Sequence, residues 1–143
     1  MAAIGRRPFH ILLLLAGSFT ICRADQAHDV LQVINRVTTA LTANNPAEAI
    51  APFDKSFAGY ATLAEYFINL TSAYSISNEA EAVDETDSTD ETKLTLDWTV
   101  TLQNERIGTS ERRREHVQVR LVRRGSRWVI VELSPLNFFA PRR

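Results

Sequence analysis

The residues that most often carry chemistry are few in this chain and lie far apart. His28 and His116 have neither the His-x-x-x-His nor the Glu-x-x-His spacing of a helical metal site. The single cysteine, Cys22, lies in the amino-terminal segment. No Gly-x-Ser-x-Gly nucleophile motif, phosphate loop or dinucleotide motif occurs among the five glycines. We therefore expect no metal, no cofactor and neither nucleophilic nor nucleotide-dependent catalysis.

Residues 1–24 have the layout of a secretory signal peptide. A short basic start precedes an apolar run over residues 9–21, and Ala24 ends the segment. The apolar run is shorter than the roughly 20 residues that a membrane-spanning helix needs, so we expect no membrane anchor. We predict cleavage near Ala24, which removes Cys22 and leaves residues 25–143 as one exported domain, periplasmic or extracellular, without disulfides.

Two other export signals share part of this pattern. A lipoprotein signal needs a small residue before the cysteine, whereas Ile21 precedes Cys22. The segment Arg6-Arg7-Pro8-Phe9 resembles part of the twin-arginine signal, but the leucines at 12–15 are more apolar than that route favours. The general secretory route is therefore favoured, and the twin-arginine route stays open.

Acidic and basic residues are separated along the chain, although its net charge is only −1. Residues 25–105 hold 14 acidic and 3 basic side chains, whereas residues 106–143 hold 10 arginines and 3 glutamates. In an antiparallel sheet, such segments form favourable cross-strand pairs. A nucleic-acid site would use Arg112, Arg113, Arg114, Arg120, Arg123 and Arg124. We expect no nucleic acid, because interleaved aromatic residues are missing and export removes that partner.

Two helices are predicted at the start of the mature chain. Apolar residues at helical spacing predict a long amphipathic helix over residues 26–43, with Asp25 as its N-cap. Asn45 is followed by Pro46 and, three residues after the cap, by Glu48. This capping-box arrangement predicts a short second helix.

A third helix is predicted after Gly59 and is opened by the motif Thr62-x-x-Glu65. Its apolar side consists of Leu63, Tyr66, Phe67 and Leu70. If Tyr66 is buried, its hydroxyl group needs a hydrogen-bond partner.

Beyond residue 73 the hydrophobic period changes to two, which predicts strands. The clearest strand has its apolar face formed by Leu94, Leu96, Trp98, Val100 and Leu102. A weaker strand over residues 74–83 precedes it, and the polar stretch over residues 84–91 is expected to turn the chain. A strand around Val119 and another over residues 128–133 follow, joined by a tight turn at Gly125. We therefore predict an α+β fold with three helices on one face of a four-stranded antiparallel sheet.

Several motifs extend this pattern over nearly all of the mature chain. They are Pro52-Phe53-Asp54, the Asp97-Trp98 pair, Arg112-Arg113, Trp128-Val129-Ile130 and Pro135-Leu136-Asn137-Phe138-Phe139. Together they resemble the nuclear transport factor 2-like superfamily, which includes ketosteroid isomerase-like and SnoaL-like proteins. The resemblance implies a cystatin-like cone, in which the concave side of a curved sheet lines a pocket. Members often have a hairpin between the second and third helices, whereas here only residues 55–59 lie between them, which predicts a shallower cone.

An isomerase-type site in such a cone needs a carboxylate base and a second acid or tyrosine that stabilises the enolate oxygen. The resemblance makes Asp54 at the pocket rim, Tyr66 and Glu132 the catalytic candidates. Glu132 is in register to face inward, although a bulge would turn it out. By alternation Asp97 faces outward, where we expect it to pair with Arg120.

The aromatic candidates for ligand contact are Tyr60, Tyr66, Phe67 and Trp98, which also fit the core. We expect Trp98 to be structural and to pack against the third helix. Because the second strand offers the pocket no polar group, we predict an exported domain that binds a small apolar molecule or a protein in or around the cone. The alternative is an isomerase- or dehydratase-like enzyme, so enzymatic activity stays open.

The outer face of the sheet is predicted to join two copies of the chain into a homodimer. It would present Thr99, Thr101, Gln118 and Val122, with either Val129 and Val131 or Trp128 and Ile130. This face is partly apolar, so exposure to water is unfavourable.

Overall fold

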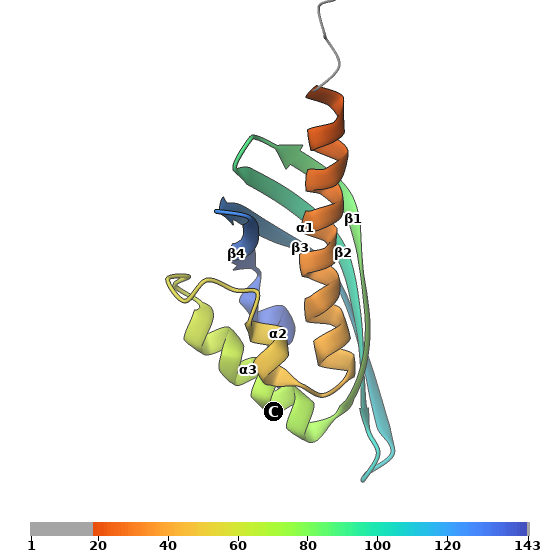
Figure 1. Cartoon of the computed structure of the whole chain (residues 1–143). Helices are drawn as coiled ribbons and strands as arrows, with labels where there is room; N and C mark the ends of the chain where they lie inside the picture. Colours follow the sequence, from red (N-terminus) through yellow and green to blue (C-terminus); the bar gives the residue numbers. More distant parts are fainter. Residues whose placement is uncertain (1–18, 143) are drawn as a thin grey trace, which may run out of the picture.

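The structure is a computed structural model that describes the backbone of residues 19–142 and the side chains of residues 25–142. Its elements are the helices α1 Phe19–Thr42, α2 Pro46–Ile50 and α3 Tyr60–Ala73, the strands β1 Ser75–Asp87, β2 Glu91–Asn104, β3 Thr109–Arg124 and β4 Arg127–Ser134, and the 3₁₀ helix η1 Leu136–Phe139. The strands form one antiparallel sheet in the order β1-β2-β3-β4. In Figure 1, α1 runs alongside β1, and α2 and α3 lie beside the end of α1. The predicted α+β meander is confirmed.

Most of the predicted signal peptide lies outside the described residues. The predicted cleavage point after Ala24 falls within α1, which begins at Phe19. The predicted helix start was therefore wrong for the intact chain, and Asp25 lies inside the helix and is not its N-cap. Among the α1 side chains that the structure describes, which begin at Asp25, the first buried one is Val30.

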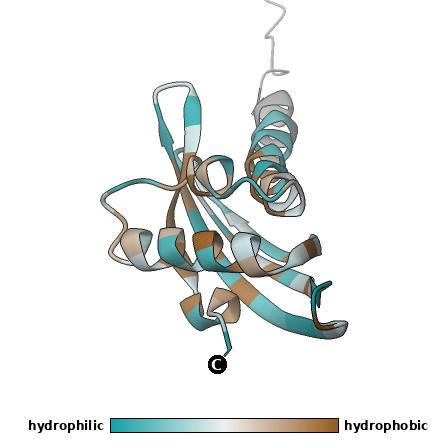
Figure 2. Cartoon of the chain, turned by 90° about the horizontal axis from the view of Figure 1, so that it is seen from below, coloured by the Kyte–Doolittle hydropathy of each residue, from teal (hydrophilic) through white to brown (hydrophobic). Residues whose placement is uncertain are grey.

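The second strand follows its sequence pattern closely. Its five predicted inward residues are at most 2% exposed, because alternate side chains of a strand point to opposite faces. Thr92 continues the same face and is fully buried. Figure 2 shows the hydrophobic colours gathered where the helices face the sheet.

Pairing of β1 with β2 extends further than the sequence predicted. The stretch 84–91 was expected to be a loop, but β1 continues to Asp87 and β2 begins at Glu91. Backbone hydrogen bonds hold this part of the ladder, and they do not depend on apolar side chains. A bulge at Val83, which has no partner in the register, shifts the pairing by one residue.

The segment between α2 and α3 is attached directly to β4. The Asn45 side chain accepts a hydrogen bond from the Glu48 amide at 3.2 Å, which confirms the predicted cap of α2. The Asp54 amide then donates to the Ile130 carbonyl at 2.8 Å, and the Ile130 amide donates to the Pro52 carbonyl at 2.9 Å. These two bonds anchor the segment without a hairpin between the helices.

The third helix begins at Tyr60, and Gly59 is its N-cap without a side-chain hydrogen bond. The motif Thr62-x-x-Glu65 lies inside the helix, so its prediction as the opening motif was wrong. A Cβ atom at Gly59 would lie 2.6 Å from Leu136 Cδ1 and 2.8 Å from Phe57 Cζ. Close packing against η1 therefore explains the glycine at this start.

The β3–β4 hairpin turns at Gly125, which has φ +64° and confirms the predicted tight turn. In β4 the register shifts between the pairs Arg120–Glu132 and Leu121–Ile130, which leaves Val131 as a bulge. Trp128 and Ile130 therefore face inward. No helix within residues 19–142 is both long and apolar enough to span a membrane.

Candidate functional site

The concave side of the sheet is filled by aromatic side chains from three parts of the chain. The Phe139 ring lies 5.2 Å from the Trp98 ring of β2 and 5.3 Å from the Phe67 ring of α3, in edge-to-face geometry. The Phe138 ring lies 4.9 Å from Phe139. All four side chains are at most 4% exposed. The carboxyl-terminal phenylalanines thus fill space on the concave side of the sheet, and we call Phe138 and Phe139 the aromatic plug.

A buried arginine holds the aromatic plug in place. Arg113 lies on the inner face of β3 and is 6% exposed. Its Nη1 atom donates to the Phe138 carbonyl at 2.8 Å and to the Ala140 carbonyl at 2.7 Å, and its Nε atom donates to Glu111 Oε1 at 2.9 Å. Glu111 also pairs with Arg142 at 3.0 Å. The period of two through Val117 and Val119 extends to Arg113, but its place in a run of three arginines concealed this signal.

The indole group of Trp98 has a hydrogen-bond partner inside the fold. Its Nε1 atom donates to Asn78 Oδ1 at 3.1 Å. The Asn78 amide in turn donates to the Thr38 carbonyl at 2.9 Å and to Thr42 Oγ1 at 3.0 Å. Trp98 is 1% exposed, so it is a core residue as predicted, and this network connects it to the end of α1.

The four residues predicted to contact a ligand divide into two pairs. Phe67 and Trp98 are buried against the aromatic plug. Tyr60 and Tyr66 lie on α3, are half-buried and pack against the same core. All four side chains therefore pack against a core that is filled by other side chains of this chain.

Two of the three catalytic candidates, Asp54 and Glu132, have separate ion-pair partners. Asp54 accepts hydrogen bonds from the Ser56 hydroxyl at 2.6 Å and the Ser56 amide at 2.8 Å, and it pairs with Arg124 at 2.8 Å. The hydrogen bonds from Ser56, with the charge of Arg124, hold the pKa of Asp54 below its usual value. Glu132 pairs with Arg120, and no hydrogen bond within residues 19–142 joins it to Asp54 or Tyr66.

Two carboxylates on the sheet face outward. The Val131 bulge turns Glu132 to the outer face. This is the alternative in which a bulge directs Glu132 away from the pocket. Asp97 also faces outward, but its predicted pairing with Arg120 was wrong. The register places Arg120 opposite Lys93, four residues from Asp97, whereas Arg114 lies on the diagonal and donates to both Asp97 oxygens at 3.0 and 2.6 Å.

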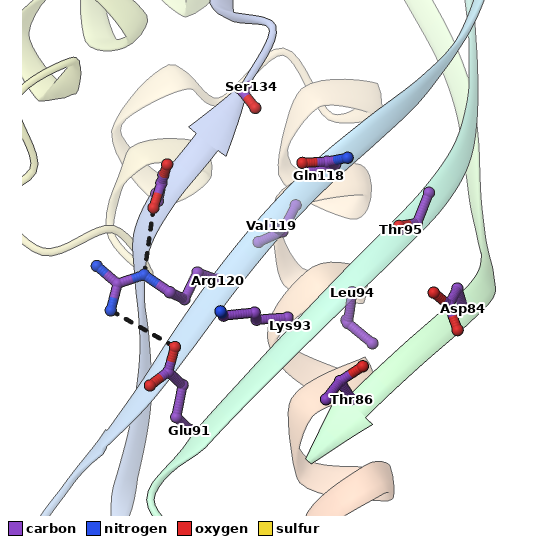
Figure 3. Close-up of a pocket in the computed structure, with 11 residues that line it drawn as sticks. Asp84, Thr86, Glu91, Lys93, Leu94, Thr95, Gln118, Val119, Arg120 and Ser134 are labelled. Atoms are coloured by element: carbon purple, nitrogen blue, oxygen red, sulfur yellow. Dashed lines mark hydrogen bonds and ion pairs between the residues drawn. The ribbon is translucent and has the colours of Figure 1, made fainter. Parts of the chain in front are cut away.

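A polar hollow of about 490 Å³ opens on the outer face of the sheet (Figure 3). Its lining includes Asp84, Thr86, Glu91, Lys93, Thr95, Gln118, Arg120, Glu132 and Ser134. Arg120 bridges two of the carboxylates, with Nη1 3.7 Å from Glu91 and Nε 3.2 Å from Glu132. Charges of both signs line the hollow, so it favours neither an anion nor a cation.

The histidines lie apart in the fold. His28 on α1 has its Nε2 atom 2.9 Å from the Gln32 side chain, and His116 lies on β3 opposite Asp97. Within the described part of the chain, no group of three or more His, Cys, Asp or Glu side chains is arranged to hold a metal ion.

No family model matches the sequence, and no curated protein matches it either. Solved structures do match. A nuclear transport factor 2-like superfamily protein from Salmonella enterica has a TM-score of 0.65 at 12% identity, over 78% of this chain and 89% of that chain.

Two further structures are similar. A protein of unknown function with a cystatin-like fold from Nostoc punctiforme has a TM-score of 0.62 at 13% identity, over 77% of this chain and 89% of that one. A hexachlorocyclohexane dehydrochlorinase, LinA type 2, has a TM-score of 0.64 at 10% identity, over 79% and 85% of the two chains. At these identities the likeness concerns the fold alone. The chain therefore has the cystatin-like fold of the nuclear transport factor 2-like and SnoaL-like proteins.

Proposed function

We propose that the mature chain is an exported, non-catalytic binding domain whose partner is a protein that contacts the outside of the cone. One observation carries the proposal: the aromatic plug fills the cone. In this fold, a small apolar ligand would occupy the same space, against Phe67 and Trp98.

The plug imposes a large cost on a ligand inside the cone. Exposing two buried phenylalanine side chains costs about 3 to 6 kcal/mol. The Arg113 hydrogen bonds to the Phe138 and Ala140 carbonyls would be lost as well. The binding free energy of a small apolar molecule would have to offset both losses, whereas a protein bound outside the cone leaves the phenylalanines buried and the Arg113 hydrogen bonds intact.

The placement of the candidate acids and bases also supports a non-catalytic role. A catalytic acid and base must both reach one bound substrate, each within about 3 Å of the atom on which it acts. Here Asp54 is held by Ser56 and Arg124, whereas Glu132 is held by Arg120 on the outer face of the sheet. The enzyme activity named for LinA belongs to that protein, with which this chain shares the fold alone.

Binding of an apolar fluorescent probe tests whether the cone is closed. Anilinonaphthalene sulfonate is titrated into the mature wild-type chain and into the double variant Phe138→Ala/Phe139→Ala. We expect no saturable binding to the wild type and about one probe per chain for the double variant. Phe57→Ala, which truncates a half-buried aromatic side chain in the loop before α3, is the matched control and should behave as wild type.

Two outcomes would contradict the proposal. Saturable one-to-one binding to the wild type, with a change in tryptophan fluorescence, would show that the plug moves aside and would favour a small apolar ligand. Turnover of a small molecule that is lost in Tyr66→Phe, without a change in stability, would favour the enzyme.

Export is tested separately by expression of the chain with and without residues 1–24. We expect the full chain to yield an exported protein whose first residue, by mass spectrometry, is Asp25. Retention in the cytoplasm, or an uncleaved chain, would contradict the export part of the proposal.

A further inference from the structure

The two edges of the sheet differ in what covers them. At the β4 edge, the segment before α3 pairs with the strand, because the Asp54 amide donates to the Ile130 carbonyl and the Ile130 amide donates to the Pro52 carbonyl. β1 forms the other edge, and among the described strands it pairs with β2 alone. Figure 1 shows α1 alongside β1 and no strand beyond it. We call this side of the sheet the open edge of β1.

The backbone of β1 has unpaired groups along the open edge. In an antiparallel pair, successive residues point their N–H and C=O groups alternately toward the partner strand and away from it. β1 has 13 residues, so about half of them direct these groups away from β2. Outside the β1–β2 ladder, the one hydrogen bond of this backbone within residues 19–142 joins the Glu85 amide to Asp84 at 3.0 Å. Such a row of free donors and acceptors is a template for one more strand.

The side chains of β1 restrict which strand can be added. Residues 75–87 include no basic residue. Their acidic residues are exposed and have no ion-pair partner in the described chain, and they are Glu79, Glu81, Asp84, Glu85 and Asp87. Pairing with β1 of a second copy would place two acidic strands side by side, which is destabilising. A strand with basic side chains would instead form favourable cross-strand pairs.

An added strand would have different neighbours on its two faces. Glu79 and Glu81 point to the outer face of the sheet, and Ala80 between them points to the inner face. α1 flanks the inner face, where its Thr38 carbonyl accepts a hydrogen bond from β1. Leu31 precedes Thr38 by about two turns on the same face of α1 and is 40% exposed. Carboxylates on one face and apolar groups on the other favour a strand in which basic and apolar residues alternate.

We propose that the open edge of β1 binds an extended basic segment of the protein partner, which adds to the sheet as a further strand. This inference rests on the function proposed above and names the surface and the chemistry of that partner. Backbone hydrogen bonds supply the affinity of such an added strand, and its side chains supply the specificity. The regular part of the edge is residues 75–82, because the bulge at Val83 shifts the register beyond it.

A fluorescein-labelled synthetic peptide in which lysine and valine alternate is the probe for the open edge. It is titrated into the mature wild-type chain at low salt, and binding is measured by fluorescence anisotropy. Two matched peptides separate the causes of binding. The first has glutamate in place of lysine. The second is N-methylated at every residue, which removes the backbone donors and keeps the charge and the side chains.

Two double variants of the mature chain test the role of the carboxylates. Glu79→Gln/Glu81→Gln removes two charges from the open edge. Asp29→Asn/Glu65→Gln removes two charges from exposed positions on α1 and α3 and is the matched control. Circular dichroism melting shows whether each variant is folded.

We expect the lysine–valine peptide to bind saturably and both matched peptides to bind at least about tenfold more weakly. The Glu79→Gln/Glu81→Gln variant should bind the lysine–valine peptide about fivefold more weakly than wild type, and the control variant should bind it as wild type does. Addition of the peptide should slow amide hydrogen exchange in residues 75–82 and leave exchange in β4 unchanged.

Four results would overturn the inference. Absence of binding at high micromolar concentration would show that the edge does not accept a basic strand. Equal binding of the N-methylated peptide would show that charge alone attracts the probe. Slower exchange at a site other than β1 would place the peptide elsewhere. Exchange in residues 75–82 that slows with protein concentration, without peptide, would show that a second copy occupies the edge.

These outcomes are distinct from failure of the proposed function. The peptide titration reports on the β1 edge, whereas the titration with anilinonaphthalene sulfonate reports on the aromatic plug. A chain that binds neither the peptide nor anilinonaphthalene sulfonate contradicts the open-edge inference and leaves the closed cone intact. Saturable binding of anilinonaphthalene sulfonate to the wild type contradicts the closed cone, whatever the peptide does.

Discussion

The two faces of this sheet are stabilised in different ways. The inner face buries β2 side chains that are at most 2% exposed and packs Trp98 against the aromatic plug. Among the described residues its one buried cation is Arg113, and each of the three guanidinium nitrogens has a hydrogen-bond partner. The outer face holds ion pairs such as Asp97–Arg114, in which the arginine side chain is 64% exposed.

This difference between the two faces indicates where a substitution lowers the free energy of unfolding most. Removal of inner-face atoms leaves a cavity or a carbonyl group without its donor, and both lower the free energy of unfolding. Outer-face charges that lose a partner are solvated again and are screened by salt. We therefore expect the loss in unfolding free energy to decrease from substitutions on the inner face to substitutions on the outer face.

The largest effect is expected for Trp98→Ala. This change removes an indole that is 1% exposed and leaves Asn78 Oδ1 without its donor. We expect a loss of about 3 to 5 kcal/mol in the free energy of unfolding, against a total of about 5 to 15 for a domain. Trp98→Phe keeps most of the apolar area and should fold with a lower melting temperature. Urea unfolding of both variants measures this, and an alanine variant that melts within about two degrees of wild type would contradict the core assignment.

A smaller loss is expected for Arg113→Met. Methionine keeps the apolar stem but leaves the Phe138 and Ala140 carbonyls without their donor. Because hydrogen bonds to charged groups contribute about 1.5 to 3 kcal/mol, we expect a loss in that range by urea unfolding. Arg112→Met, on the exposed side of the same strand, is the control and should change stability by less than about 0.5 kcal/mol. Equal losses of unfolding free energy in Arg113→Met and Arg112→Met would show that Arg113 does not hold the plug.

The ion pair beneath the plug predicts a pH dependence. The hydrogen bond from Arg113, with the charges of Arg113 and Arg142, holds the pKa of Glu111 below its ordinary value of 4.5, against an opposing effect of burial. A depressed pKa in the fold contributes stability that is complete above the unfolded value and is lost as the pH falls through the folded value. We expect wild type to be more stable than Glu111→Gln at pH 7, and this difference to shrink as the pH falls below 4.5.

The control for this pH series is Glu115→Gln, since Glu115 is exposed and has no ion-pair partner in residues 19–142. Its difference from wild type should stay nearly constant with pH. If the difference in unfolding free energy between wild type and Glu111→Gln is equally constant with pH, the proposed role of this ion pair is contradicted.

The smallest effect is expected for Asp97→Asn on the outer face. The pKa of Asp97 is lowered by its hydrogen bonds with Arg114, but the pair is in contact with water and salt. We expect only a slight change in unfolding free energy, and less still at high salt, when unfolding is measured at a concentration where the chain is monomeric by sedimentation. A loss as large as that of Arg113→Met would contradict the exposed position of this ion pair on the outer face.

Local patterns predicted the elements well because their causes lie within a few residues. Asn45 caps α2 through a neighbour three residues away, and Gly125 takes a positive φ that its own turn requires. Errors arose where distant contacts decide. The partner of Asp97, for example, depends on the register between β2 and β3.

The sequence alone predicts which face of β2 is buried, since the period of two in this strand allows only one division of its side chains. It also determined the order of helices and strands. Only the tertiary structure decided what fills the cone. The aromatic plug, the burial of Arg113 and the outward turn of Glu132 each depend on residues brought together across the sheet or on the Val131 bulge. A pattern along the chain does not record such contacts, because they arise from the register of strands and the path of the chain terminus, which are fixed only when all layers pack at once.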